Sequence, residues 1–219
     1  MSLKTILKKS YGIRTLGLSL HIATDTLISK CQVINKGCAK LNKDIKGNNN
    51  KIVIGRDSFV QNCQVRIHGN NNKILIGGGT HIGHGCSLWI DGDNIEINIG
   101  NNVTMSRDVQ LCAQESGRRI TVGEDCMFSN NIIVRTSDSH PIFDKESDER
   151  ENYSRDAFIG KHVWIAPNSK IFKGVSIGEG AVIGSDTLVT KDVPAYSLAV
   201  GHPAKIVRSG IKWTRDDIF

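Results

Sequence analysis

Between Ile159 and Val193 the chain repeats a six-residue pattern of apolar and small residues. Aliphatic residues recur at Ile159, Ile165, Ile171, Ile177, Ile183 and Val189. Small or β-branched residues follow four places later, at Val163, Ser169, Val175, Ala181, Thr187 and Val193. A period of six does not match the 3.6-residue turn of a helix, but it suits a solenoid in which each hexapeptide forms a short strand and a turn. We therefore predict an all-β solenoid with three hexapeptides in each coil.

A related repeat with a longer stride precedes the hexapeptides. Aliphatic-glycine pairs fall at Ile54-Gly55, Ile76-Gly77, Ile99-Gly100 and Val122-Gly123, at intervals of 22, 23 and 23 residues. The extra residues lie in segments rich in Gly and Asn, such as 47–50 and 69–72, and both residue types tolerate positive φ. Such segments can also mark disorder, but the aliphatic residues resume in phase after each one. We therefore predict ordered, bulged turns at one corner of each coil.

The pattern indicates a single domain, residues 1–219, because a solenoid grows by adding coils rather than a second core. Residues 1–22 differ from the rest and predict a short helix followed by a strand that caps the first coil. Residues 138–156 predict an extended loop, and residues 196–219 a C-terminal extension. No apolar run reaches the ~18 residues of a membrane span, and no signal-peptide core follows the N-terminal lysines. We expect a cytoplasmic protein.

The cysteines and the net charge of the chain indicate which cofactors and partners to expect. Six cysteines occur without any C-x-x-C pair, and Cys86 and Cys126 fall at small inward positions, so we expect buried, reduced thiols and no structural zinc. The net charge of +6 suggests an anionic partner and leaves peripheral contact with a membrane surface open. The chain has only three Trp, three Tyr and six Phe and no nucleic-acid motif, so nucleic acid is not an expected partner.

The register breaks once, between Val134 and Ile159. A polar loop of this length must leave a regular solenoid, because its backbone cannot be buried there without partners. His140 lies at the root of the loop, followed by Pro141, which stiffens the chain. An imidazole titrates near neutrality and can accept a proton from a hydroxyl. His140 is thus a candidate general base; the alternative is one surface histidine among seven.

Several motifs resemble those of the hexapeptide-repeat acetyltransferases, among them the maltose, galactoside and bacterial capsule O-acetyltransferases. They are Ser-Asp-Ser-His-Pro at 137–141, Ile-Gly-x-x-Val-Trp-Ile-Ala at 159–166, Val-Thr-Lys-Asp-Val-Pro at 189–194 and Gly-His-Pro-Ala-Lys at 201–205. The resemblance implies a left-handed parallel β-helix, a homotrimer with active sites in clefts between subunits, and acetyl-CoA as co-substrate. It implies no metal cofactor.

The resemblance also implies roles for single residues. His140 matches the family's base, which takes the proton of a sugar hydroxyl as that oxygen attacks the acetyl thioester. Asp138 or a backbone carbonyl could fix the tautomer of this histidine. Trp164 matches a Trp of the capsule-modifying members and could donate to the developing oxyanion or position the acceptor. The alternative for Trp164 is an aromatic residue packed at a subunit boundary.

On the cofactor side, small residues would let a pantetheine arm lie along the coils, and cations would suit the phosphates of the nucleotide. The matching positions are Ala166, Gly184, Thr190, Lys191 and Lys205. The alternative is that these residues cap the column and point into solvent.

The acceptor implied is a carbohydrate. The simple-sugar members carry an Asn in the coil below the histidine, where Ser106 falls nearest here. This difference, with the short N-terminal helix, favours a cell-surface polymer or glycoconjugate over a free disaccharide. An acidic polysaccharide such as polysialic acid would be attracted by the excess of Lys and Arg.

Three other functions remain open. The first is a zinc enzyme similar to β-helical carbonic anhydrases, which needs three converging histidines, whereas His81 and His84 are the only close pair. The second is N-acetylation of an amino-sugar nucleotide, although no G-x-G-x-x-G strand-turn-helix opens the chain. The third is a non-catalytic solenoid that binds a partner.

Overall fold

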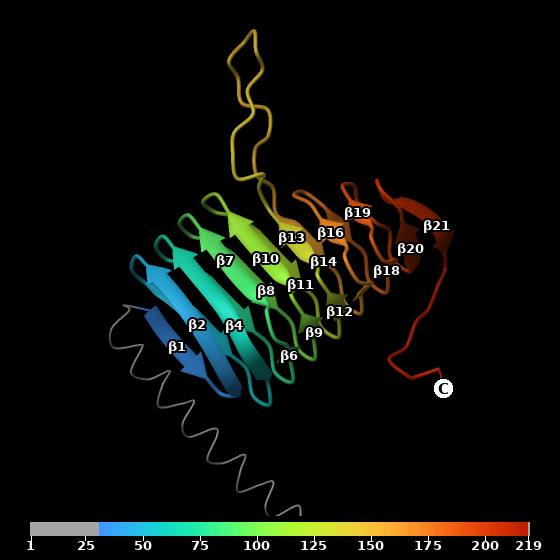
Figure 1. The fold of residues 1–219 in the computed structure, drawn as a ribbon, viewed down its shortest axis with the longest axis horizontal. Coiled ribbons are helices and arrows are strands. Elements are labelled where there is room, and N and C mark those ends of the chain that lie inside the picture. The colour runs from blue at the N-terminus through green and yellow to red at the C-terminus, as the bar shows by residue number, and fades with distance from the viewer. Residues whose placement is uncertain (1–30, 219) are drawn as a thin grey trace, which may run out of the picture.

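Residues 31–218 of the computed structural model are described here, and they form a three-sided column of short strands (Figure 1). Every element of this part of the chain is a β-strand, which confirms the predicted all-β solenoid. The helix and strand predicted for residues 1–22 lie outside the described residues. Within residues 31–218 no helix is long and apolar enough to cross a membrane.

The first wall is a seven-stranded parallel sheet. Its strands are β1 (Cys31–Asn35), β3 (Asn50–Ile54), β5 (Lys73–Ile76), β8 (Glu96–Ile99), β11 (Arg119–Val122), β14 (Ala157–Ile159) and β17 (Ser176–Ile177).

The second and third walls form one 14-stranded sheet, because β2 (Cys38–Lys46) and β4 (Phe59–His68) are long enough to run through both. The second wall continues with β6 (His81–Ile82), β9 (Thr104–Arg107), β12 (Met127–Asn130), β15 (Trp164–Ile165), β18 (Val182–Ile183) and β20 (Ser197–Val200), and β21 (Lys205–Ser209) is antiparallel to β20. The third wall continues with β7 (Ser87–Asp91), β10 (Gln110–Gln114), β13 (Ile133–Arg135), β16 (Lys170–Ile171) and β19 (Leu188–Val189).

The strand register reproduces the sequence repeat. Ile54 pairs with Ile76 and Ile76 with Ile99, so each upstream coil takes one long stride of the repeat. Ile159 pairs with Ile177, which closes a coil of three hexapeptides. The predicted coil is therefore confirmed in both parts of the column.

The inward aliphatic residues form the core. Ile54, Ile99 and Ile159 are at most 1% exposed. Removing each such side chain from water stabilises the fold by roughly 1.5–3 kcal/mol. The glycine after each aliphatic residue has a steric reason, because a Cβ at Gly77 would lie 2.5 Å from the carbonyl carbon of Gly100 in the next coil. Tight stacking of the coils therefore requires glycine at this position.

Buried asparagines order the bulged turns. Asn50 and Asn72 are 1% and 0% exposed. The Asn72 backbone N–H donates to Asn50 Oδ1 at 3.0 Å, and Asn50 Nδ2 donates to the Gly69 carbonyl at 2.9 Å. Asn72 Nδ2 makes the equivalent bond to the Gly92 carbonyl at 2.9 Å. This ladder satisfies the turn backbone, and the turns are ordered as predicted.

All six cysteines are buried free thiols. Cys86 and Cys126 are 0% exposed and occupy the small inward positions expected from the sequence. Burial raises the pKa of the Cys126 thiol to about 12, so this sulfur stays protonated and unreactive at neutral pH. These cysteines act as compact apolar side chains.

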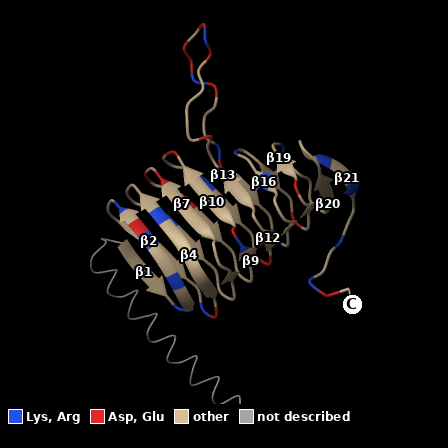
Figure 2. Cartoon of the chain, viewed as in Figure 1, with Lys and Arg blue, Asp and Glu red and all other residues tan. Residues whose placement is uncertain are grey.

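One long loop leaves the column between β13 and β14, at the corner where the third wall meets the first (Figure 1). Residues 138–156 of this loop carry seven acidic and three basic residues, and Figure 2 shows both signs near its tip. The loop is therefore acidic, although the chain as a whole carries a net charge of +6.

Candidate active site

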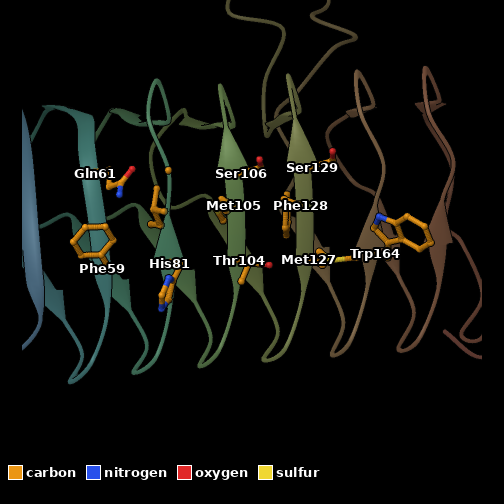
Figure 3. A pocket seen from close by; sticks show the side chains of 12 residues that line it. Phe59, Gln61, His81, Thr104, Met105, Ser106, Met127, Phe128, Ser129 and Trp164 are labelled. Atoms are coloured by element: carbon orange, nitrogen blue, oxygen red, sulfur yellow. The ribbon is translucent and has the colours of Figure 1, made fainter. Parts of the chain in front are cut away.

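A groove of about 570 Å³ lies on the outer face of the second wall (Figure 3). Its lining comes from five successive strands of this wall, β4, β6, β9, β12 and β15. The lining residues are Phe59, Gln61, His81, Ile82, Gly83, Thr104, Met105, Ser106, Met127, Phe128, Ser129 and Trp164. Because neighbouring strands are ~4.8 Å apart, the groove extends for about 19 Å along the column.

Side chains of like character form rows along the groove. Thr104, Met127 and Trp164 are register partners on three successive strands. Ser106 and Ser129 form a parallel row of hydroxyls on the side of the groove away from His81 and Thr104 (Figure 3). The groove thus combines neutral hydrogen-bonding groups with apolar contacts and has Trp164 at one end, which is a composition suited to sugar rings.

The C-terminal segment, which we define as residues 211–217, lies beside Trp164. The indole of Trp213 is 6.0 Å from that of Trp164, with the rings inclined by 47°. Its other neighbour is the imidazole of His162, on which it stacks with centroids 3.9 Å apart. Arg215 donates to Thr104 Oγ1 at 3.0 Å, so the segment also contacts the groove lining directly.

His140 lies outside this groove, exposed at the root of the long loop. Asn152 Nδ2 donates to the carbonyl of His140 and to Asp138 Oδ2, both at 2.9 Å. Asp138 also forms an ion pair with Lys173. Partial burial raises the pKa of Asp138, but the hydrogen bonds from Lys173 and Asn152 outweigh it and lower the pKa below its ordinary value. The carboxylate of Asp138 therefore anchors the loop root through Asn152 and Lys173.

A second anchor holds the returning arm of the loop. Arg150 donates to both carboxylate oxygens of Glu115, at 2.9 and 2.6 Å, and Ser137 Oγ donates to Glu115 Oε1 at 2.7 Å. The hydrogen bond from Arg150 is the main reason that the pKa of Glu115 falls to about 2. Bidentate guanidinium–carboxylate pairs fix orientation as well as distance. Glu115 belongs to the turn after β10, so this pair ties the loop to the column.

The candidate cofactor residues divide between two corners of the column. Ala166 and Gly184 follow β15 and β18 at the corner between the second and third walls, where each backbone N–H bonds to the next coil. Lys205 is nearby, paired with Val200 of β20. Thr190 and Lys191 follow β19 at the corner between the third and first walls, which is also the corner of His140. All three cofactor candidates with longer side chains, Thr190, Lys191 and Lys205, are exposed.

A single chain therefore does not bring His140 and Trp164 together. Trp164 belongs to the second wall, and His140 to the corner between the other two. This separation is what a site shared between subunits requires.

The two histidines of the close pair, His81 and His84, differ in their place relative to the groove. His81 lines the groove, whereas His84 does not. In residues 31–218 no three His, Cys, Asp or Glu side chains are grouped so that they could hold a metal ion.

Sequence reasoning missed several of these residues. Gln61 and Ser129 line the groove and could have been found by projecting the repeat from Ser106 onto neighbouring coils. Trp213 and Arg215 carry no periodic signal, because the C-terminal segment lies against the column without belonging to a coil. Its location depends on contacts with residues up to 113 positions away.

Comparison with known proteins agrees with this architecture. Residues 156–191 match the family described as bacterial transferase hexapeptide (six repeats). A polysialic acid O-acetyltransferase of Neisseria meningitidis is 32% identical over 207 residues, which cover 94% of this chain and 89% of the relative. The crystal structure of the polySia specific acetyltransferase NeuO has a TM-score of 0.75 at 35% identity, and the match covers 86% of this chain and 84% of that chain.

A further relative matches only in part. A polysialic acid O-acetyltransferase of Escherichia coli O1:K1 / APEC is 42% identical over 98 residues, which cover 45% of this chain but 32% of that relative. The chain thus spans about a third of the length of this relative.

Because the match to the meningococcal relative extends over nearly the whole chain, the chain belongs to the hexapeptide-repeat O-acetyltransferase family. The resemblance inferred from the motifs is confirmed. The predicted left-handed parallel β-helix is likewise confirmed by the structural match.

Proposed function

We propose that this protein is an acetyl-CoA-dependent O-acetyltransferase whose acceptor is an acidic cell-surface polysaccharide of the polysialic acid type. The observation that carries the proposal is the similarity over nearly the whole chain to relatives named polysialic acid O-acetyltransferases. Buried free thiols are compatible with the reducing cytoplasm as the place of action.

The reaction is a direct acyl transfer. His140 accepts the proton of a sugar hydroxyl while the hydroxyl oxygen attacks the carbonyl carbon of the acetyl thioester. The carbon–sulfur bond then breaks, and His140 passes the proton it took from the sugar hydroxyl to the departing thiolate of CoA. The products are a sugar acetate ester and free CoA thiol. No acetyl-enzyme is formed, because both substrates are held in one cleft.

The loop root supports the role of His140 as base. A useful base must be held within hydrogen-bond reach of the acceptor hydroxyl. The backbone of His140 is held by Asn152, and the loop is tied to the column through the Asp138–Lys173 and Glu115–Arg150 pairs. The exposed imidazole is thus carried on a loop whose base is anchored at two places.

We further propose a homotrimer in which the cleft lies between neighbours. One side of the cleft is the corner that carries His140, Thr190 and Lys191. The other side is the second wall of the adjacent subunit, with its groove and Trp164. Cyclic symmetry repeats this contact three times and completes three equivalent sites.

Within this cleft acetyl-CoA lies along the coils. Ala166 and Gly184 present little side chain to the pantetheine arm, and the cations of Lys191 and Lys205 favour the phosphates of the nucleotide. The indole N–H of Trp164 donates to the developing oxyanion or holds the acceptor. Each such donor is expected to contribute about 10²–10³ in rate.

The groove accommodates the acceptor. Its length of about 19 Å exceeds one sugar ring, and Gln61, Ser106 and Ser129 offer neutral hydrogen-bonding groups along it. The acidic loop repels an anionic polymer, whereas the column carries the excess of Lys and Arg. A polyanion is therefore expected to approach along the column.

The decisive assay measures release of CoA thiol from acetyl-CoA with polysialic acid, with a neutral polysaccharide, with an amino-sugar nucleotide, and with no acceptor. Thiol release with polysialic acid, accompanied by acetyl groups on the polymer that mild base removes, supports the proposal. A base-stable amide on the amino sugar would instead identify an N-acetyltransferase. Activity that is lost on prolonged chelation and restored by zinc would favour the carbonic-anhydrase-like alternative.

A further inference from the structure

The C-terminal segment is attached to the column by two side chains, of which the first is Trp213. Trp213 is 8% exposed. Its indole stacks on His162 with a ring angle of 7°, and its Nε1–H donates to the His162 carbonyl at 2.9 Å. His162 Nε2 faces the Trp213 carbonyl at 3.2 Å, and His162 Nδ1 faces Asp125 Oδ2 at 2.6 Å. Trp213 is therefore fixed in both position and ring orientation.

The second side chain is Arg215. Its Nε donates to Asp125 Oδ1 at 2.8 Å, and its Nη2 donates to the carbonyls of Asp125 and Cys126, both at 3.0 Å. The same Nη2 lies 3.3 Å from the carbonyl of Asn102, one coil away. Its Nη1 donates to Thr104 Oγ1 in the groove. Arg215 thus links two coils, and charge-assisted bonds of this kind hold their geometry well.

The groove residue in contact with Trp213 is Trp164. β15 has only two residues, and Trp164 is flanked in its row by Met127 and Val182. Neither of these neighbours has an aromatic ring. Trp213, 6.0 Å away at 47°, is in the tilted geometry in which aromatic pairs attract each other. The Trp213 ring therefore limits the orientations open to Trp164 on that side.

We propose that Trp213 and Arg215 are positioning residues, which hold Trp164 and the adjoining edge of the groove in the arrangement used for acetyl transfer. This inference rests on the proposed function for the role of Trp164. Two contacts of the segment reach lining residues of the groove, the hydrogen bond of Arg215 to Thr104 and the ring contact of Trp213 with Trp164. The segment is thus built into the site, although it lies outside the repeat.

The orientation of Trp164 can be measured without any assay of activity. The chain contains three tryptophans, at 89, 164 and 213, so Trp164 is the sole tryptophan in Trp89→Phe/Trp213→Phe and in Trp89→Phe/Trp213→Ala. The Phe variant keeps an aromatic ring against Trp164, and the Ala variant removes it. We expect emission at longer wavelength and stronger acrylamide quenching in the Ala variant. Identical emission and quenching in the two variants would overturn the proposal.

Kinetics of the full-length enzyme provide the second readout. Trp213→Ala should lower kcat/KM for the polysaccharide about 10- to 100-fold, the effect of a misplaced catalytic group, with little change in KM for acetyl-CoA. Trp213→Phe should restore most of the loss, and Ile218→Ala, fully exposed just beyond the segment, should behave as wild type. A Trp213→Ala enzyme with a lower Tm but wild-type kcat/KM per folded molecule would show that Trp213 only stabilises the fold, and would overturn the proposal. If the wild-type enzyme acetylates no acceptor, the proposed function fails, while the fluorescence pair still decides the role of Trp213.

Discussion

At the residue scale, the proposed chemistry depends on one imidazole. Replacing His140 by Ala should lower turnover by roughly 10²–10⁴, the usual contribution of a positioned general base. The affinity for acetyl-CoA should change little, because His140 serves the acceptor hydroxyl. His84→Ala is the matched control, since His84 is likewise exposed and outside the groove but does not belong to the long loop. Equal turnover of the His140 and His84 variants would remove His140 as the base.

A neighbouring pair of glycines tests the stacking of the coils. A Cβ at Gly77 would lie 2.5 Å from backbone of the next coil, whereas the nearest atom to a Cβ at Gly78 is the Arg56 carbonyl oxygen, 3.2 Å away. Gly77→Ala should therefore destabilise the fold by more than about 2 kcal/mol, and Gly78→Ala by about 1 kcal/mol or less. Thermal denaturation of the two variants side by side measures the difference. A Gly77→Ala protein as stable as Gly78→Ala would mean that the coils are not packed this closely.

Residue-level roles were only partly predictable from the sequence. The inward positions of Cys86 and Cys126 followed from the repeat, because any residue in phase with Val163 must share its environment. The partners of Asp138 did not follow, because Lys173 and Asn152 approach it from a later coil and from the far arm of the loop. Such contacts form only when segments that are distant in the sequence meet in the folded chain, and no local sequence pattern specifies them.

At the scale of the element, the attachment of the long loop should depend on pH. The folded-state pKa of Glu115 is about 2, below its ordinary value of 4.5. A lowered pKa means that the Glu115–Arg150 pair contributes its full stability above about pH 4.5 and loses it as the pH falls toward 2. Limited proteolysis within residues 138–156 should therefore accelerate between pH 5 and about 3.

Weaker attachment of the long loop can also be produced at neutral pH, by substitution of Glu115. Glu115→Gln removes the charge that Arg150 binds and should make the loop more sensitive to protease. Glu149→Gln, on the exposed outer part of the loop, is the matched control. Equal cleavage rates for the two variants at neutral pH would show that the Glu115–Arg150 pair does not hold the loop.

Elements inside the repeat were predictable together with their neighbours, whereas the contacts made by segments outside the repeat were not. The period of six and the register of Ile54, Ile76 and Ile99 were enough to predict coils, walls and turns, because side chains that repeat in phase must stack. The break after Val134 predicted a protruding loop by the same logic. The C-terminal segment follows no period, so its return along the column to Asp125 became visible only in three dimensions.

At the scale of the whole molecule, net charge should control capture of the acceptor. If Lys and Arg attract a polyanion, KM for the polysaccharide should rise between low and physiological salt, where the screening length shortens to ~8 Å. KM for a neutral polymer of similar length should stay constant, and acetyl-CoA must be saturating because it is also anionic. A salt-independent KM for the acidic polymer would indicate that the charge serves only solubility.

The most direct test of the central claim mixes two inactive subunits. If each site combines His140 of one subunit with Trp164 of its neighbour, His140→Ala and Trp164→Ala proteins should each be impaired, whereas trimers assembled from an equal mixture should regain activity. With random assembly in a threefold-symmetric trimer, about a quarter of the sites receive both intact residues, so about a quarter of wild-type activity is expected. Light scattering should report a trimer throughout. A mixture no more active than the average of its two parents would contradict a site shared between subunits.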